Sequence, residues 1–307
     1  MGADDNAPVL LIHGGAGVIR RDTDEAGQAI RAALTEALRA GHAKLHAGGS
    51  ALDAVSAAVV ALEDAPHFNA GRGAVFTHDG QNELDAAIMD GATVRAGAIA
   101  GVHRVRNPVL LARAVMEHSP HAMLAGAGAE AFAQAQGLAL VEPEYFRTEH
   151  RWRQLQEALA KDPSGKDPGD YFGTVGAVAR DAHGHLAAAT STGGMTGKRW
   201  NRIGDSPVIG AGTYANAHCA VSGTGWGEFY IRTCAAHAIC MRVAQGERLE
   251  NVAEDVINGE IPQLGGSGGA IVLGREGAFA LPFNTPGMYR GWIGADGAPN
   301  VAIWRDA

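Results

Sequence analysis

Cysteine, charged residues and long apolar runs are all scarce in this 307-residue sequence. Its three cysteines are Cys219, Cys234 and Cys240. They are too few for a disulfide framework and, being an odd number, cannot all pair, so they fit a reducing compartment. No apolar run approaches the roughly 18 to 20 residues that a membrane helix needs, and the acidic start has too short an apolar run for a secretory signal. We therefore expect a cytoplasmic protein without a membrane partner.

Basic residues are also sparse, which bears on possible partners. Charged residues make up 19% of the chain, the formal net charge is −8, and no dense block of Lys and Arg occurs. Such a chain lacks the electrostatic footprint of a nucleic-acid-binding protein. What the chain has in abundance is glycine, 43 residues, in a sequence that is 46% hydrophobic. This combination predicts a large buried core with many tight turns.

The spacing of apolar residues changes along the chain and predicts the order of its elements. Expected helices span 25–46, 50–64, 107–118, 125–136, 148–159, 226–243 and 250–257; expected strands span 9–12, 73–76, 83–89, 92–102, 174–179, 185–190, 213–222, 268–273 and 278–283. Ser50 and Asp53 form a capping-box pattern at the start of the second helix. Residues 13–17 read as a glycine loop after the first strand.

One stretch interrupts this order. Residues 161–170, KDPSGKDPGD, contain no large apolar side chain, so we expect a mobile, exposed linker. Around it, strands follow one another through hairpins instead of alternating singly with helices. This order favours an α+β fold, with mainly antiparallel sheets covered by helices, over a doubly wound parallel sheet.

A serine-hydrolase pattern is present but incomplete. Residues 265–269 read G-x-S-x-G around Ser267, and His13-Gly14-Gly15 resembles a lipase oxyanion loop. The α/β-hydrolase order places the acid and the histidine after the serine, yet the last histidine of this chain is His237. The motif also precedes an expected strand instead of following one. A tightly packed glycine turn is the favoured interpretation of 265–269.

Two further kinds of site were weighed. Residues 13–17 loosely resemble a phosphate-binding loop, but they lack G-x-G-x-x-G and the Lys-Ser/Thr of a P-loop. His183 with His185, and His118 with His121, are close pairs without an obvious third metal ligand at useful spacing. Solvent-exposed histidines are therefore the favoured interpretation of both pairs.

A series of longer motifs is more specific. In chain order they are HGGAG at 13–17, FNAGRG at 68–73, ELD at 83–85, MDG at 89–91, FGTVGAVA at 172–179, ATSTGGMT at 189–196, RIGDSP at 202–207, GTGWGE at 223–228, LGGSGG at 264–269 and PFNT at 282–285. Together they cover nearly the whole chain. In this order they resemble the signatures of plant-type asparaginases, also known as isoaspartyl peptidases, a family of N-terminal-nucleophile hydrolases.

The resemblance implies a fold and a maturation step. The fold would be a four-layer αββα sandwich in one domain, residues 1–307. A precursor would cut its own Gly173–Thr174 bond to give an α fragment, 1–173, and a β fragment, 174–307. Two processed subunits would then associate as an (αβ)₂ heterotetramer, and no organic cofactor would be needed.

The chemistry of Thr174 is consistent with this implication. A threonine hydroxyl is a poor nucleophile without a base. A free α-amine, with a pKa of roughly 8, would supply that base directly or through a water. In the uncut chain residue 174 has only an amide nitrogen, which is not basic, so cleavage and activity would be linked.

The resemblance also assigns roles to residues around Thr174. Thr192 would hydrogen-bond the nucleophile. Arg202 would grip the substrate α-carboxylate, for which a planar guanidinium is suited, and Asp205 would pair with the α-ammonium. The remaining assignments are an oxyanion hole from the Thr224 hydroxyl and the Gly225 N–H, an ammonium contact from the Gly227 carbonyl, and a site-orienting role for Asn69.

A sodium ion is the one metal that the resemblance implies. Its ligands would be backbone carbonyls, which leave no side-chain signature in the sequence. The matching positions are Leu62, Glu63, Ala65, Phe68, Ala70 and Arg72.

The expected enzyme hydrolyses the side-chain amide of asparagine and β-aspartyl dipeptides to aspartate plus ammonia or an amino acid. The sequence leaves open which of the two substrates is preferred. Trp226, between Gly225 and Gly227, would either narrow the pocket or stack on the leaving group. Two alternatives stay open: a glycosylasparaginase-like hydrolase, and an uncleaved, non-catalytic homologue.

Overall fold

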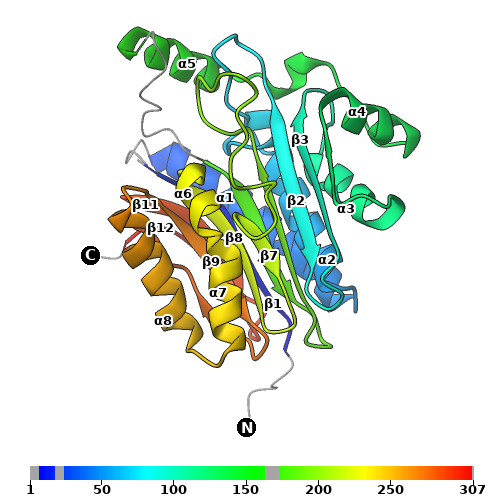
Figure 1. Ribbon diagram of the computed structural model, residues 1–307, viewed down its shortest axis with the longest axis vertical. Helices are drawn as coiled ribbons and strands as arrows, with labels where there is room; N and C mark the ends of the chain where they lie inside the picture. The colour runs from blue at the N-terminus through cyan, green and yellow to red at the C-terminus, as the bar shows by residue number, and fades with distance from the viewer. Residues whose placement is uncertain (1–6, 18–23, 163–172, 306–307) are drawn as a thin grey trace.

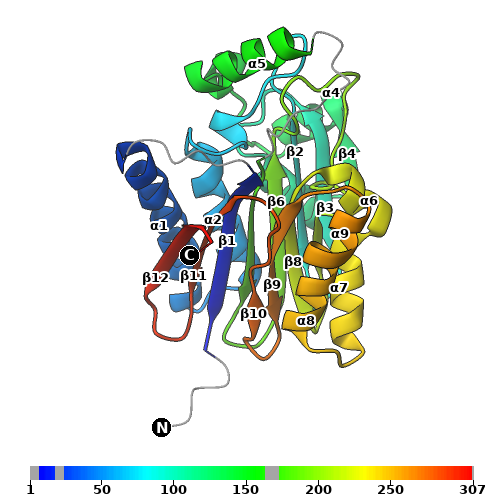
Figure 2. The ribbon, with the colours of Figure 1, turned by 90° about the vertical axis from the view of Figure 1, so that its left-hand side faces the viewer.

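The computed structural model describes residues 7–17, 24–162 and 173–305. Two β-sheets pack face to face and are covered by helices on their outer faces (Figures 1 and 2). The helices are α1 Asp24–His46, α2 Ala51–Asp64, α3 Pro108–His118, α4 Gly126–Ala135, α5 Glu149–Lys161, α6 Gly227–Thr233, α7 Ala235–Ala244, α8 Leu249–Glu254 and α9 Ile261–Gln263. The strands are β1 Val9–Gly17, β2 Leu84–Asp90, β3 Ala96–Val102, β4 Met123–Ala125, β5 Val175–Arg180, β6 Leu186–Thr192, β7 Thr213–Ala215, β8 Cys219–Gly225, β9 Gly268–Gly274, β10 Phe279–Ala280, β11 Gly287–Ile293 and β12 Pro299–Trp304.

The larger sheet has the strand order β12-β11-β1-β5-β6-β2-β3-β4, and the smaller one has the order β10-β9-β8-β7. All neighbouring strands are antiparallel except β3 and β4. Figure 2 shows α1 and α2 outside the larger sheet and α7 and α8 outside the smaller one. The predicted α+β, four-layer αββα sandwich with mainly antiparallel sheets is therefore confirmed.

Alternation along the strands explains the layers. On β1, Leu10 and Ile12 join the core beneath α1 and α2, whereas Val9 and Leu11 join the core between the two sheets. On β8, Val221 faces the core beneath α7 and α8, and Ala220 faces the other sheet. Because successive strand residues point to opposite faces, each central strand contributes to two apolar cores, and its polar positions stand out as candidates for a site.

The predicted capping box at the start of α2 is confirmed. Ser50 Oγ accepts a hydrogen bond of 3.2 Å from the Asp53 amide, and the Asp53 carboxylate accepts one from the Ser50 amide. Two amides that the helix cannot satisfy itself are thereby paired. The helix ends at Asp64, and Pro66 follows shortly after its end.

Three sequence predictions are wrong in detail. Residues 73–76 form no strand; a 3-10 turn at Gly71–Gly73 leads into irregular chain. Residues 213–222 form two strands, because the Asn216 side chain accepts the amides of His218 and Cys219 and turns the chain. Residues 226–243 form two helices, α6 and α7, because Cys234 between them adopts a left-handed conformation with φ of 48°.

Other boundaries also differ from the prediction. The glycine stretch at 13–17 continues β1 instead of leaving it as a loop, and β11 and β12 were not predicted at all. Helix α5 extends to Lys161, so the first residue of the predicted linker 161–170 is helical. The rest of that linker from 163 onward lies outside the described residues. Within the described part of the chain, no helix is long and apolar enough to cross a membrane.

Candidate active site

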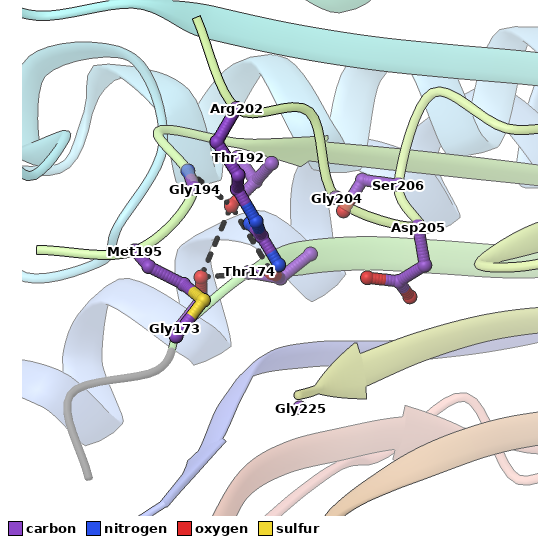
Figure 3. A pocket seen from close by; sticks show the side chains of 10 residues that line it. All are labelled: Gly173, Thr174, Thr192, Gly194, Met195, Arg202, Gly204, Asp205, Ser206 and Gly225. Atoms are coloured by element: carbon purple, nitrogen blue, oxygen red, sulfur yellow. Dashed lines mark hydrogen bonds between the residues drawn. The ribbon is translucent and has the colours of Figure 1, made fainter. Parts of the chain in front are cut away.

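The hairpin of β5 and β6 brings the two central threonines together. Val175 pairs with Ser191 in the antiparallel register, so Thr174 and Thr192 lie at the same end of the hairpin. Thr174 is 5% exposed and Thr192 is 2% exposed. Thr174 Oγ1 lies 3.1 Å from Thr192 Oγ1, and Thr192 Oγ1 in turn accepts a bond of 3.0 Å from the Gly194 amide (Figure 3). The two hydroxyls that the sequence paired are thus in hydrogen-bond contact.

The carbonyl oxygen of Gly173 is the focus of several donors. Thr174 Oγ1 lies 2.7 Å from it, Thr192 Oγ1 3.1 Å and Asn69 Nδ2 2.8 Å. Asn69 itself is held in place, because its Nδ2 also donates to the Gly194 carbonyl and its Oδ1 accepts the amide of Val75. Donors gathered on one carbonyl polarise it and stabilise negative charge that develops on its oxygen.

A small polar pocket opens beside these threonines. Figure 3 shows the Arg202 side chain reaching toward Thr174, with Asp205 and Gly225 at other sides of the same space. The residues that line it are Gly173, Thr174, Thr192, Gly194, Met195, Arg202, Gly204, Asp205, Ser206 and Gly225. The pocket therefore unites Gly173, Thr174, Thr192, Arg202, Asp205 and Gly225 of the predicted site.

Asp205 is a buried acid whose pKa is shifted. The residue is 4% exposed, and among the described residues its Oδ2 atom has no hydrogen-bond partner. Burial raises the pKa of Asp205 to about 6, and the positive charge of Arg202 opposes this rise. A carboxylate of this kind, open to a pocket and short of a donor, is suited to receive a cationic group of a ligand.

Arg202 has a partner that the sequence did not assign. Its Nε and Nη2 donate to the two carboxylate oxygens of Glu228, at 2.9 and 2.7 Å. Burial alone would raise the pKa of Glu228, but the hydrogen bonds and the charge of Arg202 outweigh it and hold the pKa below its usual value. Glu228 belongs to the GTGWGE motif, so its motif position was the signal available for finding it.

Gly227, Gly225 and Thr224 of the predicted site are tightly packed or buried. A Cβ on Gly227 would meet Asp205 Oδ1 at 2.6 Å and Arg202 Nη2 at 3.1 Å, so both pocket side chains pack against this glycine. Gly225, at φ of 150°, packs equally tightly against Ser267. Thr224 is fully buried one residue away, and its Oγ1 accepts the amide of Ala16 at 3.2 Å.

A buried histidine was missed as a neighbour of Thr174. His13 Nδ1 lies 3.0 Å from the Thr174 carbonyl oxygen, and His13 Nε2 lies 2.8 Å from Ser222 Oγ. His13 was noticed only as the first residue of a glycine-rich motif. Its contact with Thr174 arises from the pairing of β1 with β5, which local spacing cannot reveal.

The alternative sites are not assembled. Residues 264–265 form a turn, Gly266 after it packs against Phe229 and Ile261, and Gly269 lies in β9 against Met288 and Phe283. His118, His121, His183 and His185 are exposed. Among the described residues no group of three or more His, Cys, Asp or Glu is placed to hold a metal ion.

Comparison with known proteins decides the family. The family model described as asparaginase matches residues 6–303. The chain belongs to this asparaginase family. It is 52% identical to an isoaspartyl peptidase of Salmonella typhimurium, over 98% of this chain and 100% of the relative. The isoaspartyl peptidase of Escherichia coli is also 52% identical, over 97% and 96% of the two chains. The isoaspartyl peptidase/L-asparaginase of Homo sapiens is 41% identical, over 92% and 91%.

The expected family is thereby confirmed for nearly the whole chain. The motifs on which the resemblance depended now have places in the fold. HGGAG forms the end of β1. The part of FGTVGAVA from residue 173 onward leads into β5 and runs along it, and ATSTGGMT runs along β6 and continues past the end of that strand. RIGDSP and GTGWGE supply the pocket residues Arg202, Asp205 and Gly225.

Proposed function

We propose that this asparaginase-family chain is an isoaspartyl peptidase and L-asparaginase that matures by cutting its Gly173–Thr174 bond. The observation that carries the proposal is the position of Thr174 Oγ1. It lies against the Gly173 carbonyl on one side and lines the pocket with Arg202 and Asp205 on the other. One hydroxyl is thus placed to act first on its own chain and then on a ligand.

Self-cleavage would proceed as an acyl shift. Thr174 Oγ adds to the Gly173 carbonyl carbon, its proton passes to the Thr174 nitrogen, and the C–N bond breaks to leave an ester. Water then hydrolyses this ester to the Gly173 carboxylate and a free Thr174. Asn69 Nδ2 and Thr192 Oγ1 already donate to the carbonyl oxygen that becomes negative in the first step.

Hydrolysis of the substrate would repeat the same chemistry. The free α-amine of Thr174 accepts the hydroxyl proton while Oγ adds to the side-chain carbonyl of a β-aspartyl group. The amine or ammonia leaves with a proton, a β-aspartyl ester forms on Thr174, and water releases aspartate. Thr192 would keep the hydroxyl oriented, and the Thr224 hydroxyl and Gly225 N–H would stabilise the oxyanion.

Two opposite charges would select the substrate's head group. Arg202 offers a guanidinium for an α-carboxylate, and Asp205 offers an ionised oxygen for an α-ammonium group. The Gly227 carbonyl would add a contact to the ammonium, beside the carboxylate that packs on it. Replacing Arg202 with Lys should mainly raise KM, because an ammonium cannot match a planar carboxylate at two points. An unchanged KM would contradict its carboxylate role.

The end of α2 and the loop after it would hold a sodium ion through the backbone carbonyls of Leu62, Glu63, Ala65, Phe68, Ala70 and Arg72. One observation supports this assignment. The carbonyl of Leu62 would normally accept the amide of residue 66 in a helix, but residue 66 is proline and has no N–H. We expect a higher melting temperature in sodium chloride than in choline chloride at equal ionic strength. Equal melting temperatures would contradict the assignment.

Processed subunits would associate as (αβ)₂. We expect light scattering of the mature protein to give twice the chain mass of 31.7 kDa. A mass of one chain would contradict this assembly.

The function is tested by assaying asparagine, several β-aspartyl dipeptides and a glycosylated asparagine in parallel with denaturing electrophoresis. Wild-type protein should run as two bands and hydrolyse the first two substrates. Thr174→Ala should remain a single, inactive chain. The matched control is Thr233→Ala, which also removes a hydroxyl that donates to a backbone carbonyl, but in α6.

Each alternative predicts a different result. Preference for the glycosylated substrate would make the chain glycosylasparaginase-like, whereas one persistent, inactive wild-type band would make it a non-catalytic homologue. A processed and active Thr174→Ala protein would overturn the assignment of the nucleophile.

A further inference from the structure

The structure contains a buried chain of polar side chains behind the nucleophile, outside the pocket. His13 lies on β1, opposite Gly176 of β5, and is fully buried. A Cβ on residue 176 would lie 2.4 Å from His13 Nε2 and 2.0 Å from Ser222 Oγ, so only glycine leaves room for their contact. The imidazole therefore bridges Thr174, the residue just before β5 of the larger sheet, and Ser222 on β8 of the smaller one.

The protonation state of His13 follows from its partners. Burial lowers its pKa to about 3, against the opposing effect of its hydrogen bond to Thr174, so the imidazole is neutral at neutral pH. The carbonyl oxygen of Thr174 can only accept a hydrogen bond, so Nδ1 must carry the proton and donate it. Nε2 is then an acceptor, and Ser222 Oγ must donate to it.

The same logic sets the direction of the next bonds. Because the Ser222 proton is used on His13, the 2.7 Å contact between Thr190 Oγ1 and Ser222 Oγ requires Thr190 to donate. The 2.6 Å contact of Thr213 Oγ1 with Thr190 Oγ1 then has Thr213 as donor. These hydroxyls are fully buried, so solvent does not set the direction of donation. Thr190 and Thr213 also lie within hydrogen-bond distance of the carbonyls of Gly212 and Ser206, at 3.2 and 2.9 Å, so each shares its single proton between two acceptors.

We propose that His13 is a positioning residue for the reaction, acting as a fixed Nδ1–H donor that holds the carbonyl of Thr174 and thereby orients its Oγ and its nitrogen. The inference rests on the proposed function, since it concerns how that nucleophile is set. Oγ, the nitrogen and the carbonyl carbon are all attached to Thr174 through Cα. Fixing the carbonyl oxygen from behind leaves Oγ1 in contact with Thr192 and the Gly173 carbonyl.

Two substitutions separate positioning from packing. In His13→Asn the side-chain nitrogen can take the place of Nδ1, so a donor to the Thr174 carbonyl is kept while the Ser222 contact is lost. In His13→Gln the amide reaches instead toward the place of Nε2, so the Ser222 contact is kept and the donor is lost. Both substitutions disturb the core to a similar degree.

We expect His13→Gln to lower kcat on a β-aspartyl dipeptide at least tenfold, and to slow conversion of one band into two by a similar factor. His13→Asn should stay within about threefold of wild type in both, a span of roughly 0.7 kcal/mol. KM should change little in either variant, because among the described residues the His13 side chain is hydrogen-bonded to Thr174 and Ser222 and not to the head-group residues Arg202 and Asp205. Each kcat is calculated per mole of processed enzyme, so that slow maturation does not lower it. Equal losses in the two variants, or an unaltered His13→Gln, would overturn the proposal.

A second measurement does not depend on either variant being folded. In ¹⁵N-histidine-labelled wild-type protein, two-bond nitrogen–proton spectra should show one ring in the Nδ1–H neutral form that does not titrate between pH 5 and 8. A charged ring or the Nε2–H form for the buried histidine would contradict the assignment. If wild-type protein neither matures nor hydrolyses β-aspartyl amides, the proposed function fails. If it does both and His13→Gln equals it, only this inference fails.

Discussion

The guanidinium of Arg202 and the carboxylate of Glu228 meet edge to edge, with Nε 2.9 Å from Oε1 and Nη2 2.7 Å from Oε2. This pairing uses one edge of the guanidinium and fixes its plane. The Nη1 atom lies beside Gly204, another pocket residue, where an added Cβ would be 2.8 Å away. Glu228 therefore presents Arg202 to the pocket already oriented.

Glu228→Gln should raise KM for asparagine about three- to tenfold, while kcat stays within about twofold. The neutral amide can accept on only one atom, so the guanidinium loses the two-point contact that orients it, a difference of roughly 1 kcal/mol. The matched control is Glu247→Gln, which alters an equivalent two-point pair with Arg242, with Oε1 2.9 Å from Nε. Steady-state kinetics would contradict this account if KM were unchanged, or if the control raised it equally.

Asp205→Asn should make the folded protein more stable at pH 8. The pKa of Asp205 is raised from its ordinary 3.8 to about 6, chiefly by burial, so ionisation destabilises the folded state. At about 1.4 kcal/mol per pH unit, the shift of about two units corresponds to roughly 3 kcal/mol above pH 6. This gain should shrink as pH falls from 6 and vanish below about 4. Urea unfolding at pH 4 and 8 measures it.

Asp79→Asn is the control for this measurement, because the Asp79 side chain is 87% exposed and its removal should change stability little. A gain in stability from Asp205→Asn that is the same at both pH values would show that charge is not its source.

The same titration of Asp205 should weaken ligand binding. The affinity for L-aspartate should fall below pH 6, as Asp205 takes up a proton. Calorimetric affinities that stay constant from pH 7 to pH 5 would contradict a role in holding the ammonium.

Asn69→Ala should slow self-cleavage by about a hundredfold. Asn69 Nδ2 donates to the Gly173 carbonyl, and loss of one donor to a developing oxyanion typically costs this much. The control is Asn82→Ala, since Asn82 is also buried and its Nδ2 also donates to backbone carbonyls, those of Ala74 and Val75. Band conversion over time after purification measures both. Equal slowing by the two variants would mean that Asn69 acts only through stability.

Gly227→Ala should raise KM more than it lowers kcat. The added methyl would lie 2.6 Å from Asp205 Oδ1 and 2.8 Å from the Asp205 amide, so the head-group carboxylate must move. Gly128→Ala is the matched control, because nothing lies within 4 Å of a Cβ at that exposed helical position. If Gly227→Ala leaves KM for asparagine unaltered, the head group is not bound beside this glycine.

The sequence predicted the layers of the fold because its periodicity is local. Leu10 and Ile12 alternate with Val9 and Leu11 between the two faces of β1, which predicts a strand. Ser50 and Asp53 form a capping box, which predicts the start of α2, so both elements could be predicted from neighbouring residues. The break at Cys234 could not be read in this way, since a cysteine carries no turn signal, yet the residue adopts a left-handed conformation between α6 and α7.

The site residues also fall into those that the sequence predicted and those that it did not. Thr174, Thr192 and Arg202 were identified through long motifs and not through spacing, and the pocket brings them together. The roles of His13 and Glu228 escaped because they depend on partners 161 and 26 residues away, Thr174 and Arg202. Such contacts are created by strand pairing and by the loops between sheets, which no short window of sequence contains.

The central claim is that Thr174 becomes active by gaining a free amino group. Purified protein should be followed by intact mass, N-terminal sequencing and β-aspartyl dipeptide hydrolysis in the same time course. The account predicts a new fragment that begins at Thr174 and ends at Ala307, and hydrolysis that rises in proportion to it. Full activity in chains whose Gly173–Thr174 bond is intact, or a fragment that begins at another residue, would contradict it.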